Sequence, residues 1–204
     1  ASMDAAAAQY EFITVMPLQT KYPEGGEKQL ISAITGREVP SGALPISVGA
    51  FVVNVTTALA CYEAICLGQP LTRRVVTVTG PDLKRPGNYR LTIGQNLLEI
   101  IEMAGGIPKG TGKVILGGPM MGRTASNLDA PTTKGVSGIL LLPEEESMRR
   151  PTEPCIRCAR CVEACPMGLE PYLLSTYSRL QRYDDAEENK VMNCIECGSC
   201  SYTC

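Results

Sequence analysis

The chain has 204 residues, a formal net charge of −2 and no histidine. This length suits one to three domains, and the weak charge, with a pI near 5.4, provides no electrostatic footprint for nucleic acid or an anionic membrane surface. The lack of histidine excludes histidine ligation of haem and Rieske centres, histidine-containing zinc sites and histidine acid–base catalysis, so metal binding must use sulfur or carboxylate.

The N-terminal stretch "ASMDAAAAQ" has neither a basic region nor a long apolar run. We expect it to be a remnant of the expression vector followed by the end of a helix, not a signal peptide. The most apolar window, residues 48–68, contains Asn54 and Glu63. It is better explained by a buried strand that leads into a helix than by a membrane span.

The first segment is predicted to end near Leu71. Gly25 and Gly26 break the chain before a helix around residues 30–34, and a strand is expected at 48–55. A second helix is expected at 56–67, ending before a glycine. Its apolar stripe, which we expect to be buried, consists of Leu59, Tyr62, Ile65 and Cys66.

Two cysteines lie on this second predicted helix. Cys61 and Cys66 are five residues apart, so on a helix they point about 140° from one another and cannot pair. We expect both to be inert packing residues.

Residues 72–148 are predicted to form a small α+β unit in which one helix lies against a sheet. The helix is expected within residues 95–106, and the pair Pro86-Gly87 is expected to form a turn. The strands are expected at 73–79, 113–118 and 138–142. The charged, proline-bounded stretch that follows, 143–154, is typical of a linker.

The last segment holds two cysteine arrays with a helix of about 13 residues between them. The apolar stripe of this helix consists of Tyr172, Leu173, Thr176, Tyr177 and Leu180. At about 1.5 Å per residue the helix would span about 20 Å, so a turn after it would bring the second array beside the first.

Each array has the spacing C-x2-C-x2-C-x3-C, and Pro166 follows the first one. In two-cluster ferredoxins the first three cysteines of each run hold one cubane and the fourth ligates the other. The sequence therefore predicts two 4Fe–4S clusters, one held by Cys155, Cys158, Cys161 and Cys204, the other by Cys194, Cys197, Cys200 and Cys165. Because no proline follows Cys204, we expect the natural chain to continue.

Structural zinc and disulfides are the alternatives for these thiols. A third cysteine three positions after a C-x2-C pair is unusual for structural zinc, and disulfides at this spacing are not expected in an intracellular chain. The duplication of a specific motif favours iron–sulfur clusters.

Three glycine-containing motifs are candidates for ligand binding. "GTGK" at 110–113 is followed by Val114 where a phosphate loop needs Ser or Thr. "GGPMMG" at 117–122 is predicted to be a tight loop rather than a ligand contact. "YPEGGE" at 22–27 is either a plain turn or a helix start whose backbone N–H groups approach a phosphate.

The segments "KYPEGGEKQLISAITGREVPSGALP", "NVTTA", "RVVTVTG" and "GGPMMG", together with the double array, resemble the C subunit of the Rnf electron transport complex. The resemblance covers nearly the whole chain from Tyr10. It implies an α+β multidomain chain: a partial complex I flavin-subunit-like α/β segment (1–71), a β-grasp domain of the soluble-ligand-binding type (72–148) and an α-helical two-cluster ferredoxin domain (149–204).

The resemblance also implies FMN contacts. The residues that correspond to the flavin motifs of the complex I relative are Tyr22, Gly25, Glu27, Asn54 and Thr57. Gly26 and Thr56 stand where those motifs have glutamate. The family's glycine-rich flavin and nucleotide loop precedes this chain, which alone is expected not to bind FMN or NADH tightly.

The function that the resemblance implies is electron transfer between flavin or NADH and partner subunits, in a ferredoxin:NAD oxidoreductase that translocates ions. No catalytic residue is assigned in this chain. Its expected place is peripheral, at the cytoplasmic face of the bacterial inner membrane, with the other subunits, ferredoxin or NADH as partners and no nucleic acid. The acidic excess from residue 151 onward favours low cluster potentials.

Two other functions stay open. A cobalamin reductase of the propanediol-utilisation type resembles the same architecture and would prefer a corrinoid partner. A non-catalytic module that binds a ligand or partner would use its cysteines for structural metal instead.

Overall fold

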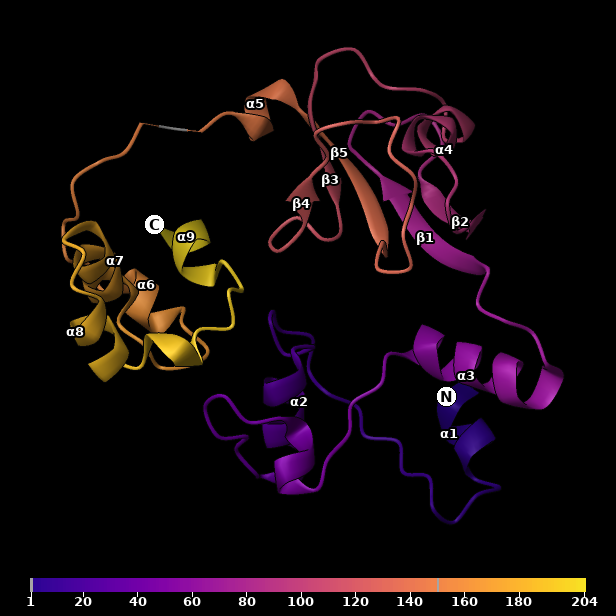
Figure 1. Cartoon of the computed structure of the whole chain (residues 1–204), viewed down its shortest axis with the longest axis horizontal. Coiled ribbons are helices and arrows are strands. Elements are labelled where there is room, and N and C mark those ends of the chain that lie inside the picture. Colours follow the sequence, from indigo (N-terminus) through magenta and orange to yellow (C-terminus); the bar gives the residue numbers. More distant parts are fainter. Residues whose placement is uncertain (1, 150) are drawn as a thin grey trace. The chain divides into compact units, whose positions relative to one another are not determined.

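A computed structural model describes residues 2–149 and 151–204. The chain forms two compact units, Ala1–Val52 and Val53–Cys204, and each is described by itself (Figure 1). Within the described residues, no helix is both long enough and apolar enough to cross a membrane. The prediction for the extreme N-terminus includes Ala1, and that for the linker includes Arg150; both residues lie outside the described part.

The first unit contains two short α-helices and one 3-10 helix. They are α1 (Ser2–Ala7), α2 (Glu27–Thr35) and η1 (Pro45–Val48). Helix α2 confirms the helix expected after the glycine pair; its Ile31 is buried, and Gly36 ends it with a φ of 67°.

The strand predicted at 48–55 is wrong. Val48 ends the 3-10 helix, and Gly49 has a φ of 71°, which lies outside the β region. Phe51 is 83% exposed, and Asn54 already caps the following helix. These apolar residues therefore belong to an exposed connection, not to a buried strand.

Helix α3 (Val55–Leu67) opens the second unit and confirms the second predicted helix. The Asn54 side chain accepts the N–H of Thr56 at 3.0 Å, and Gly68 ends the helix with a φ of 65°. The prediction of a buried stripe is wrong, because the helix has no buried residue and its Ile65 is 83% exposed. Cys61 and Cys66 are also exposed, so neither is a packing residue here.

A five-stranded sheet in the order β2-β1-β5-β3-β4 forms the body of the second unit. The strands are β1 (Arg73–Thr79), β2 (Gly87–Thr92), β3 (Thr111–Leu116), β4 (Arg123–Thr124) and β5 (Gly138–Pro143). β1 and β5 are parallel, and the other pairs are antiparallel. The expected turn at Pro86-Gly87 is wrong, because Gly87 is already the first residue of β2.

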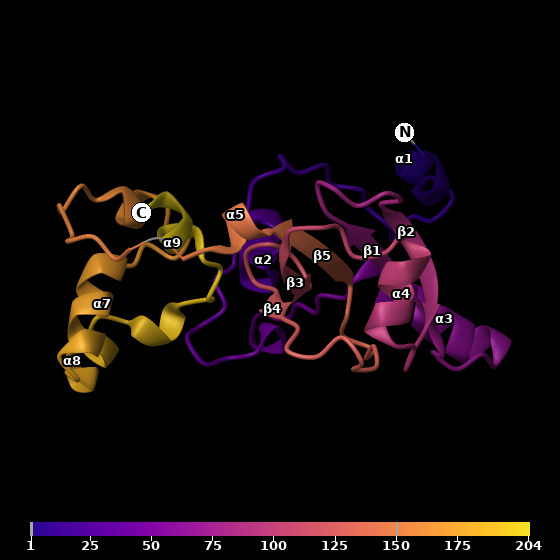
Figure 2. The ribbon, with the colours of Figure 1, turned by 90° about the horizontal axis from the view of Figure 1, so that it is seen from above.

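Helix α4 (Leu97–Met103) packs on this sheet, as Figure 2 shows from above. Leu97, Ile100 and Ile101 of α4 are at most 1% exposed, and β1 presents Val76 and Val78 to them. The alternating burial of β1 follows from the two-residue period of a strand. The predicted α+β unit with one helix against a sheet is confirmed.

The "GGPMMG" segment is the tight loop that joins β3 to β4. A Cβ on Gly122 would lie 2.4 Å from Cγ2 of Ile115 and 2.5 Å from the carbonyl oxygen of Gly118. Only glycine therefore fits at Gly122 without a shift of the backbone.

The predicted linker contains the short helix α5 (Glu144–Ser147). This helix lies close to β3. A Cβ added to Gly112 of β3 would lie 2.6 Å from the Cα of Glu144. The prolines and charges of the segment do not exclude one helical turn that begins after Pro143.

The C-terminal segment is helical. Its elements are α6 (Arg160–Glu163), α7 (Pro171–Arg179), α8 (Tyr183–Glu188), η2 (Val191–Asn193) and α9 (Ser199–Thr203). The single helix predicted between the arrays is shorter than expected, since α7 ends at Arg179 and Gln181 has a φ of 56°. The expected turn back occurs, and α6 packs against α9.

Candidate metal centre

The two cysteine arrays share positive φ angles at two equivalent positions. The second residue after the first cysteine has a positive φ in both arrays, 56° at Arg157 and 54° at Glu196. The residue after the second cysteine also has a positive φ, 62° at Ala159 and 78° at Gly198. Left-handed residues turn the chain sharply, so each array folds into a compact loop.

Each loop then leads into a short helix. Ala159 and Gly198 are the N-caps of α6 and α9, which places Cys161 and Cys200 in equivalent positions at the start of these helices. The contact between α6 and α9 brings the two loops together. The sequence repeat is therefore also a structural repeat.

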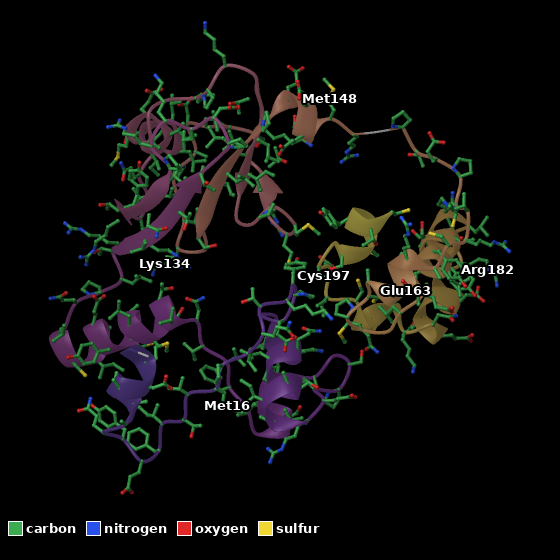
Figure 3. All side chains as sticks on the ribbon, turned by 180° about the vertical axis from the view of Figure 1, so that it is seen from behind. Met16, Lys134, Met148, Glu163, Arg182 and Cys197 are labelled. Carbon is green, nitrogen blue, oxygen red and sulfur yellow. The ribbon has the colours of Figure 1, made fainter. Side chains whose placement is uncertain are left out.

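The sulfur atoms differ in their surroundings. Cys197 is 7% exposed, Cys161, Cys165 and Cys200 are half-buried, and the other four thiols of the arrays are exposed. The backbone N–H of Leu169 donates to Sγ of Cys165 at 3.4 Å. The thiol of Cys197, which Figure 3 labels, donates to Oγ of Ser199 at 3.4 Å.

A small group of polar side chains lies beside the first array. The hydroxyl of Tyr172 donates to Oε1 of Glu170 at 3.3 Å. The negative charge of Glu170 is the main cause that raises the pKa of Tyr172, and the guanidinium of Arg157 opposes it. These three side chains therefore interact electrostatically beside the cysteines of the first array.

The residues of the arrays suit an iron–sulfur cofactor in donor chemistry and in backbone form. Thiolates are the ligands of 4Fe–4S clusters, and the paired left-handed turns shape each array into a loop around its first three cysteines. Within the described residues, 2–149 and 151–204, no three cysteine or carboxylate side chains lie close enough together to hold a metal ion.

Tyr22, Gly25 and Glu27 lie in the turn that leads into α2. Tyr22 is 49% exposed, Glu27 is the first residue of the helix, and a Cβ on Gly25 would meet nothing within 4 Å. The N–H of Gly26 donates to the carbonyl of Pro23 at 2.7 Å. That N–H is engaged in a plain turn and is not free for a phosphate.

Asn54 and Thr57 lie at the start of α3, in the other compact unit. The Asn54 Oδ1 accepts both the N–H and the hydroxyl of Thr56, at 3.0 and 2.6 Å. The N–H of Thr57 donates to the carbonyl of Asn54 at 2.9 Å. In this structure Asn54 therefore acts as a helix cap, and its role toward a flavin stays a prediction.

Sequence reasoning missed Ser199 and Leu169, whose groups bond to sulfur. An alignment of the two arrays could have pointed to Ser199, because this serine aligns with Arg160, which has no hydroxyl group. The bond from Leu169 had no signal, since it comes from the backbone.

Three family models match the chain in succession. They are a Nuo51 FMN-binding domain over residues 1–63, an SLBB domain over 75–124 and a 4Fe-4S dicluster domain over 147–204. The domain types, together with the mixed sheet and the cysteine loops, define a flavin and iron–sulfur protein. The predicted cofactor classes, FMN and 4Fe–4S clusters, are thereby confirmed.

Curated relatives match most of the chain. The C subunit of the Na(+)-translocating ferredoxin:NAD(+) oxidoreductase complex of Acetobacterium woodii is 48% identical over 181 residues, 89% of this chain and 41% of the relative. The C subunit of the proton-translocating complex of Clostridium ljungdahlii is 48% identical over 86% of this chain and 38% of the relative. The C subunit of the ion-translocating oxidoreductase complex of Rhodobacter capsulatus is 45% identical over 83% of this chain and 32% of the relative.

The chain belongs to the family of the C subunits of these ion-translocating oxidoreductase complexes, and the resemblance to the Rnf subunit is confirmed. It spans less than half the length of the relatives it matches.

Proposed function

We propose that this chain carries electrons between a flavin site and partner subunits of a ferredoxin:NAD oxidoreductase that translocates ions. The observation that supports this function best is the repeated cysteine loop. Two arrays with equal spacing and equal backbone turns are packed together through α6 and α9. Such pairing suits two redox centres that exchange electrons over a short distance.

In this proposal the chain holds two 4Fe–4S clusters, each of which supplies one-electron transfer when bound. Cys155, Cys158 and Cys161 hold one with Cys204. Cys194, Cys197 and Cys200 hold the other with Cys165. The exchange of the fourth ligand between the loops would tie the two ends of the segment together.

The flavin part of the proposal concerns Tyr22, Gly25, Glu27, Asn54 and Thr57. All five lie within residues 1–63, the part of the chain that the FMN-binding family model matches. Ion coupling, direct contact with other subunits, and attachment at the cytoplasmic face of the membrane belong to the whole complex and are proposed by analogy with the relatives. The β-grasp label for the sheet body is likewise a proposal.

The test is anaerobic reconstitution of the chain with iron and sulfide, followed by metal and sulfide analysis and EPR of the reduced protein. We expect about eight irons with matching acid-labile sulfide, and reduced-cluster signals that disappear when Cys158 and Cys197 are both replaced by serine. Cys61→Ser is the matched control, because Cys61 lies outside the arrays, and it should leave the iron content unchanged.

The alternatives appear as other outcomes of the same experiment. Zinc without sulfide would contradict the proposal and support a binding module with structural metal. A reduced protein that passes electrons to a corrinoid but not to ferredoxin or a flavin would support a cobalamin reductase. FMN added to the same preparation reports flavin binding through its fluorescence, with Asn54→Ala and Glu27→Ala as the variants expected to weaken it.

A further inference from the structure

The two arrays differ at one position that faces a sulfur atom. Ser199 follows Gly198, and its Oγ accepts a hydrogen bond from the thiol of Cys197 at 3.4 Å. The equivalent residue of the first array is Arg160, which is exposed and carries no hydroxyl group. Among the described residues, the array sulfurs with a hydrogen bond are those of Cys165, which accepts from a backbone N–H, and Cys197, which donates to Ser199.

Both of these sulfurs belong to the same proposed cluster. Under the ligand exchange proposed above, Cys165 joins Cys194, Cys197 and Cys200. The set of Cys155, Cys158, Cys161 and Cys204 has no such hydrogen bond in the described part of the chain. The structural repeat is therefore symmetric in its backbone and asymmetric in its polar contacts to sulfur.

We propose that Ser199 is a positioning residue that raises the reduction potential of the cluster held by Cys165, Cys194, Cys197 and Cys200, and so makes the two clusters unequal. This inference rests on the proposed function. The hydroxyl of serine can donate as well as accept, so when Cys197 is a thiolate the O–H of Ser199 turns toward its sulfur. It thereby acts on the cluster through Cys197, without being a ligand.

The direction of the effect follows from charge. Reduction by one electron adds one negative charge to the site, and a hydrogen bond to an ionised acceptor strengthens as that charge grows. The reduced state is therefore stabilised more than the oxidised state, and hydrogen bonds to sulfur are a known means of setting cluster potentials. The half-buried position of Ser199 limits competition from water for this bond.

The test is an EPR-monitored redox titration of the reconstituted full chain. In Ser199→Ala we expect one of the two midpoint potentials to fall, by up to about tenfold in the reduction equilibrium or about 59 mV for a one-electron couple, while the other midpoint stays in place. Ser199→Thr retains a hydroxyl group and should retain the parent potentials. Ser201→Ala, on the same short helix, controls for changes in α9 itself.

Three results would overturn the inference: no shift in Ser199→Ala relative to Ser201→Ala, an equal shift of both midpoints, or a shift of the same size in Ser199→Thr. Iron and sulfide content, measured for every variant, separates this failure from failure of the proposed function. If the parent chain takes up no iron–sulfur clusters, the proposed function is wrong and this inference falls with it. If two clusters form and neither midpoint responds, only this inference is wrong.

Discussion

Two glycines of the loop between β3 and β4 show how closely single residues are constrained. A Cβ on Gly122 would collide with Ile115 and the backbone of Gly118, whereas a Cβ on Gly118 would meet nothing within 4 Å. Glycine is therefore sterically required at position 122 but not at position 118.

We expect Gly122→Ala to lower the free energy of unfolding by about 1–3 kcal/mol, because the added methyl forces the β3 backbone or Ile115 to move. Gly118→Ala is the matched control and should change it by less than about 0.5 kcal/mol. Urea denaturation followed by circular dichroism measures both. Equal effects of the two substitutions would contradict the steric explanation.

A second residue-scale feature is the ion pair at the start of α8, between Arg182 and Asp185. The guanidinium of Arg182, a residue that Figure 3 labels, donates to both carboxylate oxygens of Asp185, at 2.7 and 2.8 Å, and lies over the ring of Tyr177. The hydrogen bond between the two side chains lowers the pKa of Asp185 and raises the pKa of Arg182.

The sign of the pH dependence follows. Because the pKa of Asp185 is lower in the folded state, its contribution to stability is present above the ordinary carboxyl pKa and is lost as the pH falls through the folded value. Arg182→Gln should raise the pKa of Asp185, measured by NMR titration of its carboxyl carbon. Arg179→Gln, one turn earlier, is the control. An unchanged Asp185 pKa in Arg182→Gln would show that the pair does not form in solution.

At the scale of elements, α3 and α4 differ in what covers them. Helix α4 is shorter, yet Leu97, Ile100 and Ile101 are buried against the sheet. Helix α3 is longer and strongly apolar, yet none of its residues is buried. Apolar composition thus predicts a helix but not its burial, because burial needs a partner surface.

Ile100→Ala should lower the free energy of unfolding by about 2–5 kcal/mol, because Ile100 is 0% exposed and its removal leaves a cavity. Ile107→Ala removes the same atoms from a side chain that is 41% exposed and should cost much less. Thermal denaturation of both variants checks this difference. Similar losses in the two would mean that α4 does not pack as described.

At the scale of the whole molecule, the hydrophobic core and the cysteine arrays occupy different parts of the chain. The main cluster of buried residues runs from Val76 to Leu141. From residue 151 onward the buried apolar residues are Leu169, Ala186 and Cys197. So few buried side chains provide little hydrophobic stabilisation, and we expect the stability of this segment to come largely from the proposed metal ligation.

Removal of iron by a chelator should therefore unfold residues 151–204 and leave the sheet body folded. We expect hydrogen exchange of α7 and α8 to become fast while β1, β5 and α4 stay protected, as measured by mass spectrometry. A mock-treated sample with its iron intact is the control. Protection of α7 and α8 that survives complete loss of iron would contradict this prediction.

Local patterns in the sequence determined much of the molecule. The spacing of Cys155, Cys158 and Cys161 and its repeat at Cys194 indicated iron–sulfur ligation, because such spacing reflects the local chemistry of one loop. The alternation of β1 and the helix α4 were likewise readable, since their periodicity expresses contact with a single core.

Only the tertiary structure decided the rest. The connection at 48–55 resembles a strand in composition, and α3 resembles a core helix, but no partner surface covers them in the described chain, so pattern alone misled. The pairing of α6 with α9 joins distant segments of the chain, and the contact of Ser199 with Cys197 depends on the side-chain conformations of one loop. Burial and helix pairing depend on which distant segments meet, and this is why they cannot be read from neighbouring residues.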